Sequence, residues 1–83
     1  MPRTTYYVAL PFSRDEDGAF LAGEAVECQS RPAALARASG LARATGNVGA
    51  VAFSRTGDLE LGDFDPAEVL RREGEVPEDL SEL

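Results

Sequence analysis

The sequence contains no histidine, and its 83 residues include one cysteine, Cys28. Without histidine, imidazole cannot act as a base or bind a metal, and a cysteine–histidine nucleophile pair is excluded. One cysteine cannot form an internal disulfide, which favours a reducing compartment. No segment approaches the ~20 apolar residues of a helical membrane span, and the start has no signal-peptide-like apolar run. We therefore expect a cytosolic protein that is not an enzyme and does not insert into membranes.

Lysine is also missing, so all eight basic residues are arginines, and alanine and glycine are frequent. This bias is typical of a GC-rich bacterial genome, so we give the arginines no functional meaning on that ground. No glycine loop of the phosphate-binding kind and no zinc-ligand spacing is present, and no cofactor is expected.

The formal net charge of −7 is concentrated near the C-terminal end. Residues 1–57 hold six arginines against five acidic residues, whereas residues 58–83 hold two against ten. Such a charge repels nucleic acids and anionic membranes, and it favours solubility and cationic partners. We therefore do not expect nucleic-acid binding. The segment 75–83, with Pro77 and four acidic residues, is predicted to be a mobile acidic tail.

Alternating apolar residues predict the strands. In the range 4–12, apolar side chains recur at every second position, so they share one face of an extended chain: Tyr6, Val8, Leu10 and Phe12. Further strands are expected at about 19–28, at 48–55 and, shorter, at 59–61. Gly23 is expected to mark a bulge or a close backbone contact within the strand at about 19–28.

Two helices are expected between and after these strands. Pro32 suits the first turn of a helix that extends to Thr45, and Ser30 or Gln29 lies near its cap. A second, short helix is predicted from a capping-box pattern followed by a glycine stop, formed by Asp65, Pro66, Glu68 and Gly74.

The order β-β-α-β-β-α predicts an α+β fold in a single domain over residues 1–74. Its small antiparallel sheet would have three to four strands, one crossover helix on one face and a short C-terminal helix.

The first helix offers a candidate partner-binding face. Small residues and two arginines lie on the side away from its apolar stripe: Ala36, Arg37, Gly40, Arg43 and Ala44. A glycine inside a helix costs ~1 kcal/mol relative to alanine, which invites a packing reason, such as the close approach of a second helix. The partner would be a second copy or another protein. The competing interpretation is an alanine-rich solvent face produced by genomic bias.

The loop 13–24 has calcium-like spacing. Counted from Ser13, it places Asp15, Asp17 and Glu24 at the third, fifth and twelfth positions of an EF-hand loop, with Gly18 at the sixth. The first position is serine and both flanks are predicted strands, whereas the motif needs helices. An acidic hairpin loop is the competing interpretation, with calcium binding as an alternative function.

Residues 15–38 resemble HicB-type antitoxins. The shared elements are an acidic turn (Asp15 to Phe20), a strand, Cys28 and a helix opening at Ala33-Ala34-Leu35. The resemblance implies a small acidic protein that neutralises an RNA-cleaving toxin, often as an oligomer. Two motifs of that family are missing, a Pro-Gly before the cysteine and a Gly-x-Thr before the helix.

The function expected from the sequence is a non-catalytic protein-interaction module, either a homodimer or the partner of another protein. The helix face or the acidic tail would make the contact, although the tail also fits a purely solubilising role. An antitoxin-like regulator and a calcium-binding protein are the alternatives.

Overall fold

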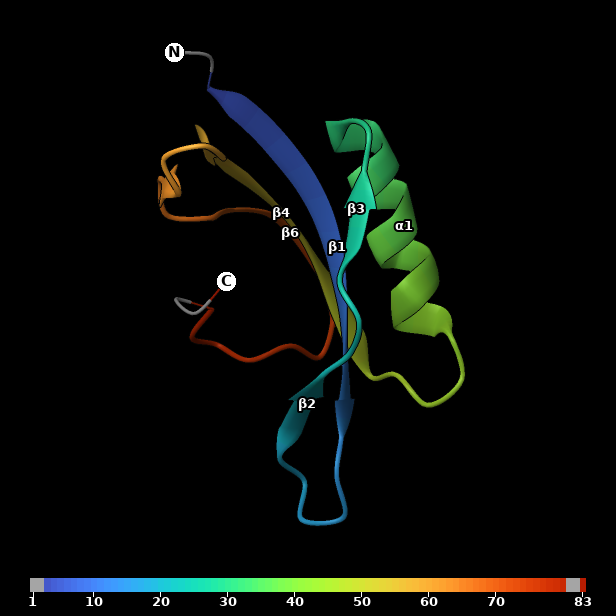
Figure 1. The fold of residues 1–83 in the computed structure, drawn as a ribbon. Coiled ribbons are helices and arrows are strands. Elements are labelled where there is room, and N and C mark those ends of the chain that lie inside the picture. Colours follow the sequence, from blue (N-terminus) through green and yellow to red (C-terminus); the bar gives the residue numbers. More distant parts are fainter. Residues whose placement is uncertain (1–2, 81–82) are drawn as a thin grey trace.

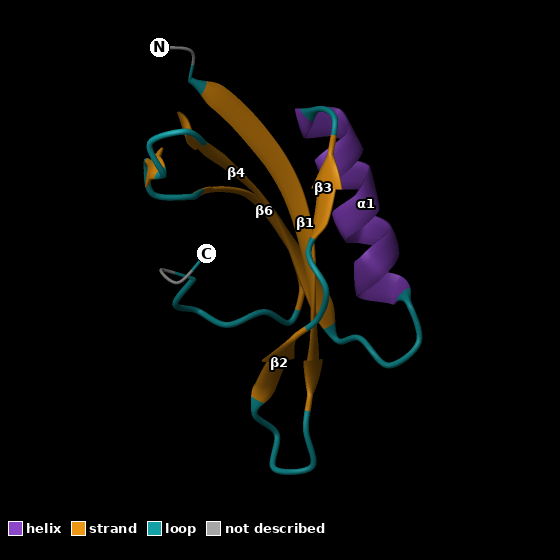
Figure 2. Ribbon diagram, in the orientation of Figure 1, coloured by secondary structure: helices purple, strands orange, loops and turns teal. Residues whose placement is uncertain are grey.

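The computed structural model describes residues 3–80 and 83, which form a curled antiparallel sheet with one helix on one face (Figure 1). The elements are, in chain order, β1 (Thr4–Arg14), β2 (Phe20–Ala22), β3 (Val26–Cys28), α1 (Arg31–Arg43), β4 (Gly49–Asp58), β5 (Asp63–Phe64) and β6 (Glu68–Gly74). Figure 2 shows that α1 lies on one side of the strands, while the C-terminal segment runs along the other.

The two long strands β1 and β4 form the centre of the sheet. They pair antiparallel from Thr4↔Gly57 to Phe12↔Gly49. The outer edge of β1 pairs with β2 and β3, and the outer edge of β4 pairs with β5 and β6. Because β4 has neighbours on both edges and is buried from Gly49 to Ser54, it is the most enclosed element of the described chain.

The predicted fold class is wrong, because the protein is mostly β and has one helix among the described residues. The segment predicted as a C-terminal helix is instead β6, which pairs with β4 across a register shift at Ala52/Phe53. The capping pattern at Asp65 is a local signal for a helix too short to be stable by itself. Pairing with β4 satisfies the backbone groups of both segments, so tertiary context overrides the local signal.

The sheet also has six strands rather than three to four. Residues 59–62, which include the predicted short strand, form a turn, and the chain returns as β5. The Asp58 side chain fixes this turn, because its Oδ1 accepts the N–H groups of Glu60 and Leu61 at 2.9 and 3.4 Å.

The predicted strand at 19–28 is divided into β2 and β3, and Gly23 lies in the break. The Gly23 N–H donates to the Pro11 carbonyl at 2.9 Å. A Cβ on Gly23 would lie 2.9 Å from Cγ of Pro11, so the two chains approach as closely as glycine permits.

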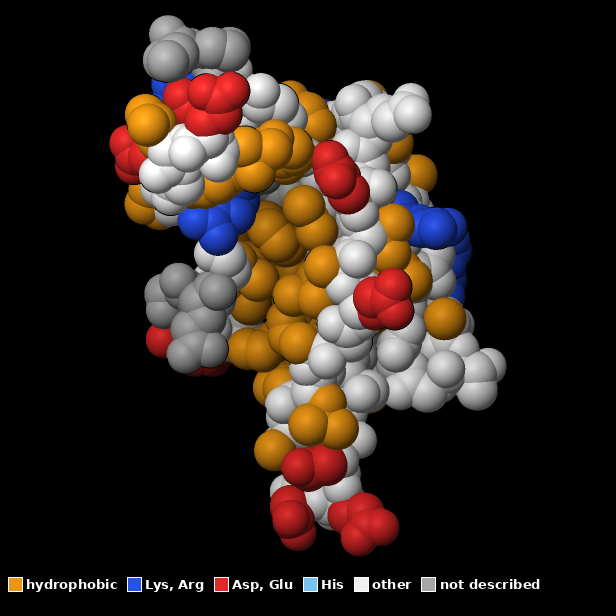
Figure 3. All heavy atoms as spheres, in the orientation of Figure 1, with side chains coloured by type: hydrophobic (Ala, Val, Ile, Leu, Met, Phe, Trp, Pro, Cys, Tyr) orange, Lys and Arg blue, Asp and Glu red, His pale blue; other side chains and the backbone are white. Residues whose placement is uncertain are grey.

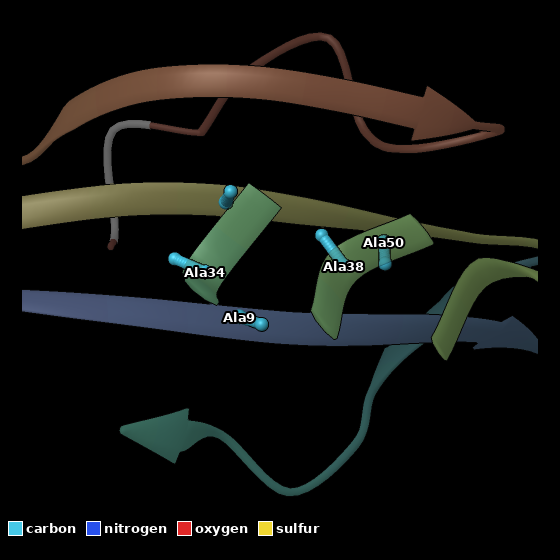
Figure 4. Close-up of a cluster of buried hydrophobic side chains, with 5 residues drawn as sticks. Ala9, Ala34, Ala38 and Ala50 are labelled. Atoms are coloured by element: carbon cyan, nitrogen blue, oxygen red, sulfur yellow. The ribbon is translucent and has the colours of Figure 1, made fainter. Parts of the chain in front are cut away.

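The helix begins where the sequence predicts, with Ser30 as N-cap accepting the Ala33 N–H at 3.2 Å and Pro32 in the first turn. The most buried layer between the helix and the sheet consists of alanines. This alanine layer comprises Ala9, Ala34, Ala38, Ala50 and Ala52, all fully buried (Figure 4). Short side chains on both surfaces allow the helix to lie close to β1 and β4.

Apart from Tyr7, which packs against the alanine layer, the larger apolar side chains of β1 and β4 lie on the other side of the sheet. We call this surface the open face and define it by Val8, Leu10, Phe12, Val51 and Phe53. No helix covers it within the described residues. The segment 59–66, which includes β5, and the C-terminal segment curl over parts of it instead (Figure 1). Phe12, Val51 and Phe53 are buried, whereas Val8 and Leu10 are partly exposed, so the open face offers apolar side chains for binding mainly where these segments do not cover it.

Candidate interaction surface

The open face contains a hollow that no segment of the described chain fills. This first hollow has a volume of about 340 Å³ and is lined by Tyr6, Val8, Ala25, Glu27, Arg55, Leu59 and Phe64. Figure 3 shows an apolar floor sunk between flanking segments, with charged side chains at its margins. The hollow exists because β1, β3 and the 58–64 turn surround the floor on three sides.

Aromatic rings and one arginine give the first hollow its chemistry. The rings of Tyr6 and Phe64 lie with centroids 6.1 Å apart, tilted by 50°. The Arg55 guanidinium carbon lies 5.4 Å from the Phe64 ring centroid. Nε of Arg55 is buried and has no hydrogen-bond partner among the described residues. The hollow therefore suits an apolar group that packs against these rings.

A second hollow, of about 460 Å³, lies further along the open face, under the C-terminal segment. Strand residues Leu10, Phe12, Phe20 and Ala22 line one side of it, and Pro77, Asp79, Leu80 and Leu83 line the other. From this segment Val76, Leu80 and Leu83 pack against the cluster of Phe12, Val51 and Phe53. The apolar residues of the predicted acidic tail thus lie on the open face.

Three arginines from three strands contact this C-terminal segment. Arg14 of β1 donates from Nε to the Glu75 carboxylate at 3.1 Å. Arg72 of β6 donates to the carbonyls of Pro77 and Glu78 at 3.3 and 3.5 Å. Arg55 of β4 donates to the Leu83 carbonyl at 3.2 Å. These contacts do not test the predicted mobility of the tail, which stays a prediction. Glu82 lies outside the described residues.

Comparison with known protein families, with curated proteins and with solved structures gives no match. In the described part of the chain, no helix is both long and apolar enough to cross a membrane.

The predicted helix-face residues all lie exposed on α1 and at its C-terminal end: Ala36, Arg37, Gly40, Arg43 and Ala44. A Cβ built on Gly40 meets nothing within 4 Å, so no contact within the chain requires glycine there. Arg37 and Arg43 form no ion pair with any described residue. The structure therefore places these residues together on one surface, and their role as a partner site stays a prediction.

In the calcium-like loop, the carboxylate of Asp15 is used within the hairpin. The Asp15 side chain accepts the N–H groups of Asp17 and Ala19, both at 2.9 Å, and so closes the hairpin between β1 and β2. Asp17 and Glu24 are exposed. Within residues 3–80 and 83, no group of three or more potential ligands could hold a metal ion. The hairpin thus accounts for the spacing of Asp15, Asp17 and Gly18, whose φ is +84°.

The open face is the site that sequence reasoning missed. The signal was present, because Tyr6, Val8, Leu10 and Phe12 were assigned to one face of the first strand. What the alternation did not reveal is that the small residue of the opposite face, Ala9, points toward the helix. The larger apolar side chains Val8, Leu10 and Phe12 therefore lie on the face away from the helix.

Proposed function

We propose that the protein is a non-catalytic interaction module that binds a protein partner through the open face. The observation that carries the proposal is the orientation of the central strands, whose large apolar side chains point away from α1 and leave the first hollow unfilled. Exposed apolar surface beside a hollow is the usual mark of a binding site.

The edge of the first hollow favours a protein over a small molecule. Leu59 and Leu61, in the turn beside the hollow, are each 68% exposed. A small ligand in the hollow would contact Leu59 and leave Leu61 in water, whereas a protein surface can cover both leucines together with the floor. Tyrosine, phenylalanine and arginine, which line the hollow, are also residue types enriched in protein interfaces.

The experiment compares the proteins that co-purify with three versions of the chain after cross-linking in cells. Leu59→Asp places a charge at the hollow on an exposed turn, so the fold should be retained. Gly40→Arg places a charge on the exposed face of α1 and serves as the matched control. We expect one or more partners held by the wild type and by Gly40→Arg and lost from Leu59→Asp. A partner lost only from Gly40→Arg would assign binding to the helix face, and identical recovery by all three would refute both surfaces.

Self-association through α1 is the second form of the proposal, favoured by the unoccupied space beyond Gly40. Light scattering after size exclusion, at low and high protein concentration, tests it. A mass of two chains that returns to one chain in Gly40→Arg supports a homodimer through α1. A mass of one chain at every concentration rules it out.

A further inference from the structure

We propose that the strand surface beneath the C-terminal segment, beside the second hollow, binds an acidic, leucine-containing peptide segment of a partner protein, and that the chain's own C-terminal segment covers this surface as a competitor. The inference rests on the proposed function and names the chemistry of the partner. It follows from the way in which the open face holds residues 75–80 and 83.

The apolar part of this recognition comes from spaced aliphatic side chains. Val76 and Leu80 are half-buried against Phe12, Val51 and Phe53, although they belong to a segment without helix or strand structure. A segment held in this way contributes side chains to the hollow and gives no strand pairing to the sheet. Another segment with aliphatic residues at the same spacing would fill the same space.

The polar part comes from the three arginines described above. Arg72 and Arg55 donate to backbone carbonyls, which any extended peptide presents. Arg14 recognises a carboxylate and also lies over the Phe20 ring, with its guanidinium carbon 3.9 Å from the centroid. Of these three arginines, Arg14 is the one that contacts a carboxylate, so this contact favours an acidic residue in the bound segment, as Glu75 is in the chain's own.

The same contacts allow the C-terminal segment to be displaced. Its ion pair is exposed, with the Arg14 and Glu75 side chains 38% and 65% accessible, and such pairs contribute little. The segment follows directly after β6 through Gly74, whose φ of +67° turns the chain. It is therefore held largely by its high effective concentration, which a partner segment overcomes when it binds more tightly.

The experiment measures binding of a labelled peptide, GEVPEDLSEL, to the full chain by fluorescence anisotropy. This peptide has the sequence of residues 74–83. Leu80→Ser in the protein removes the most distal aliphatic anchor before Ser81 and weakens the internal competitor. We expect the Leu80→Ser protein to bind the peptide roughly tenfold more tightly than the wild type, since the fraction of protein with this strand surface uncovered sets the apparent affinity.

Two controls separate specific recognition from non-specific binding. A peptide in which Gln and Asn replace the acidic residues should bind several-fold more weakly, and Arg72→Gln in the Leu80→Ser protein should weaken binding of the original peptide. Equal affinity of both peptides, or no gain in Leu80→Ser protein that circular dichroism shows to be folded, would overturn the inference. A mass of two chains that persists in Gly40→Arg would also overturn it, because it would assign this surface to exchanged segments of two copies. Loss of partners from Leu59→Asp tests the first hollow alone, so either proposal can fail while the other stands.

Discussion

Replacing Ala38 by leucine should destabilise the protein markedly, because the most buried layer between helix and sheet consists of alanines. Ala38 is fully buried, and so are Ala9, Ala50 and Ala52, the strand alanines of the same cluster. Leucine adds three carbon atoms at a position whose fully buried neighbours have only methyl groups. Overpacking of this kind costs about 1–3 kcal/mol. For a domain of this size, each kcal/mol lowers Tm by about 4–8 °C.

Urea unfolding followed by circular dichroism measures the change, with Ala36→Leu as the matched control. Ala36 is one half-turn away on the exposed side of the same helix, so its substitution changes helix propensity equally but enters no core. We expect the control to stay within about 0.5 kcal/mol of the wild type. Equal stability of Ala38→Leu and Ala36→Leu would show that α1 does not lie close to the sheet, and the assignment of the open face would fail with it.

Three further substitutions test other parts of the structure by the same unfolding measurement. Gly40→Ala should stabilise the protein by about 0.5–1 kcal/mol, because the position is helical and a methyl group meets no atom there; a loss of stability would indicate a contact across this face. Gly49→Ala should cost about 2 kcal/mol or more, since its methyl group would overlap the backbone of Glu75. An unchanged urea midpoint for Gly49→Ala would mean that the backbone of Glu75 does not pass close to Gly49. Asp58→Ala should cost about 1–2 kcal/mol through loss of the two turn hydrogen bonds. Asp58→Asn, which retains an acceptor, should lose less, and equal losses would contradict this role of the side chain.

The parts of the fold that could be predicted from the sequence are those fixed by local chemistry. Ser30 and Pro32 define the start of α1 in any context, because a cap and a fixed φ need no distant partner. Alternation along β1 and the close contact of Gly23 belong to the same class. Each of these predictions depends on neighbouring residues along the chain.

The parts that could not be predicted depend on pairing between distant segments. Nothing local at Val69 or Leu70 indicates that β4, some 15 to 20 residues earlier, needs a partner on its second edge. The capping pattern at Asp65 and Pro66 therefore gave the wrong element. The candidate site was missed for a related reason, since the placement of α1 against Ala9 rather than against Val8 is decided by packing.

The division of apolar residues between the two faces links stability to binding. The alanine layer excludes water but buries little area per residue, so much of the apolar burial falls to Phe12, Val51 and Phe53 on the open face. The segment from Glu75 onward helps to cover these side chains. Removing it without replacement would expose them and destabilise the sheet, whereas a partner segment that takes its place would keep them buried. Exchange of one segment for the other therefore costs less than opening the face to water.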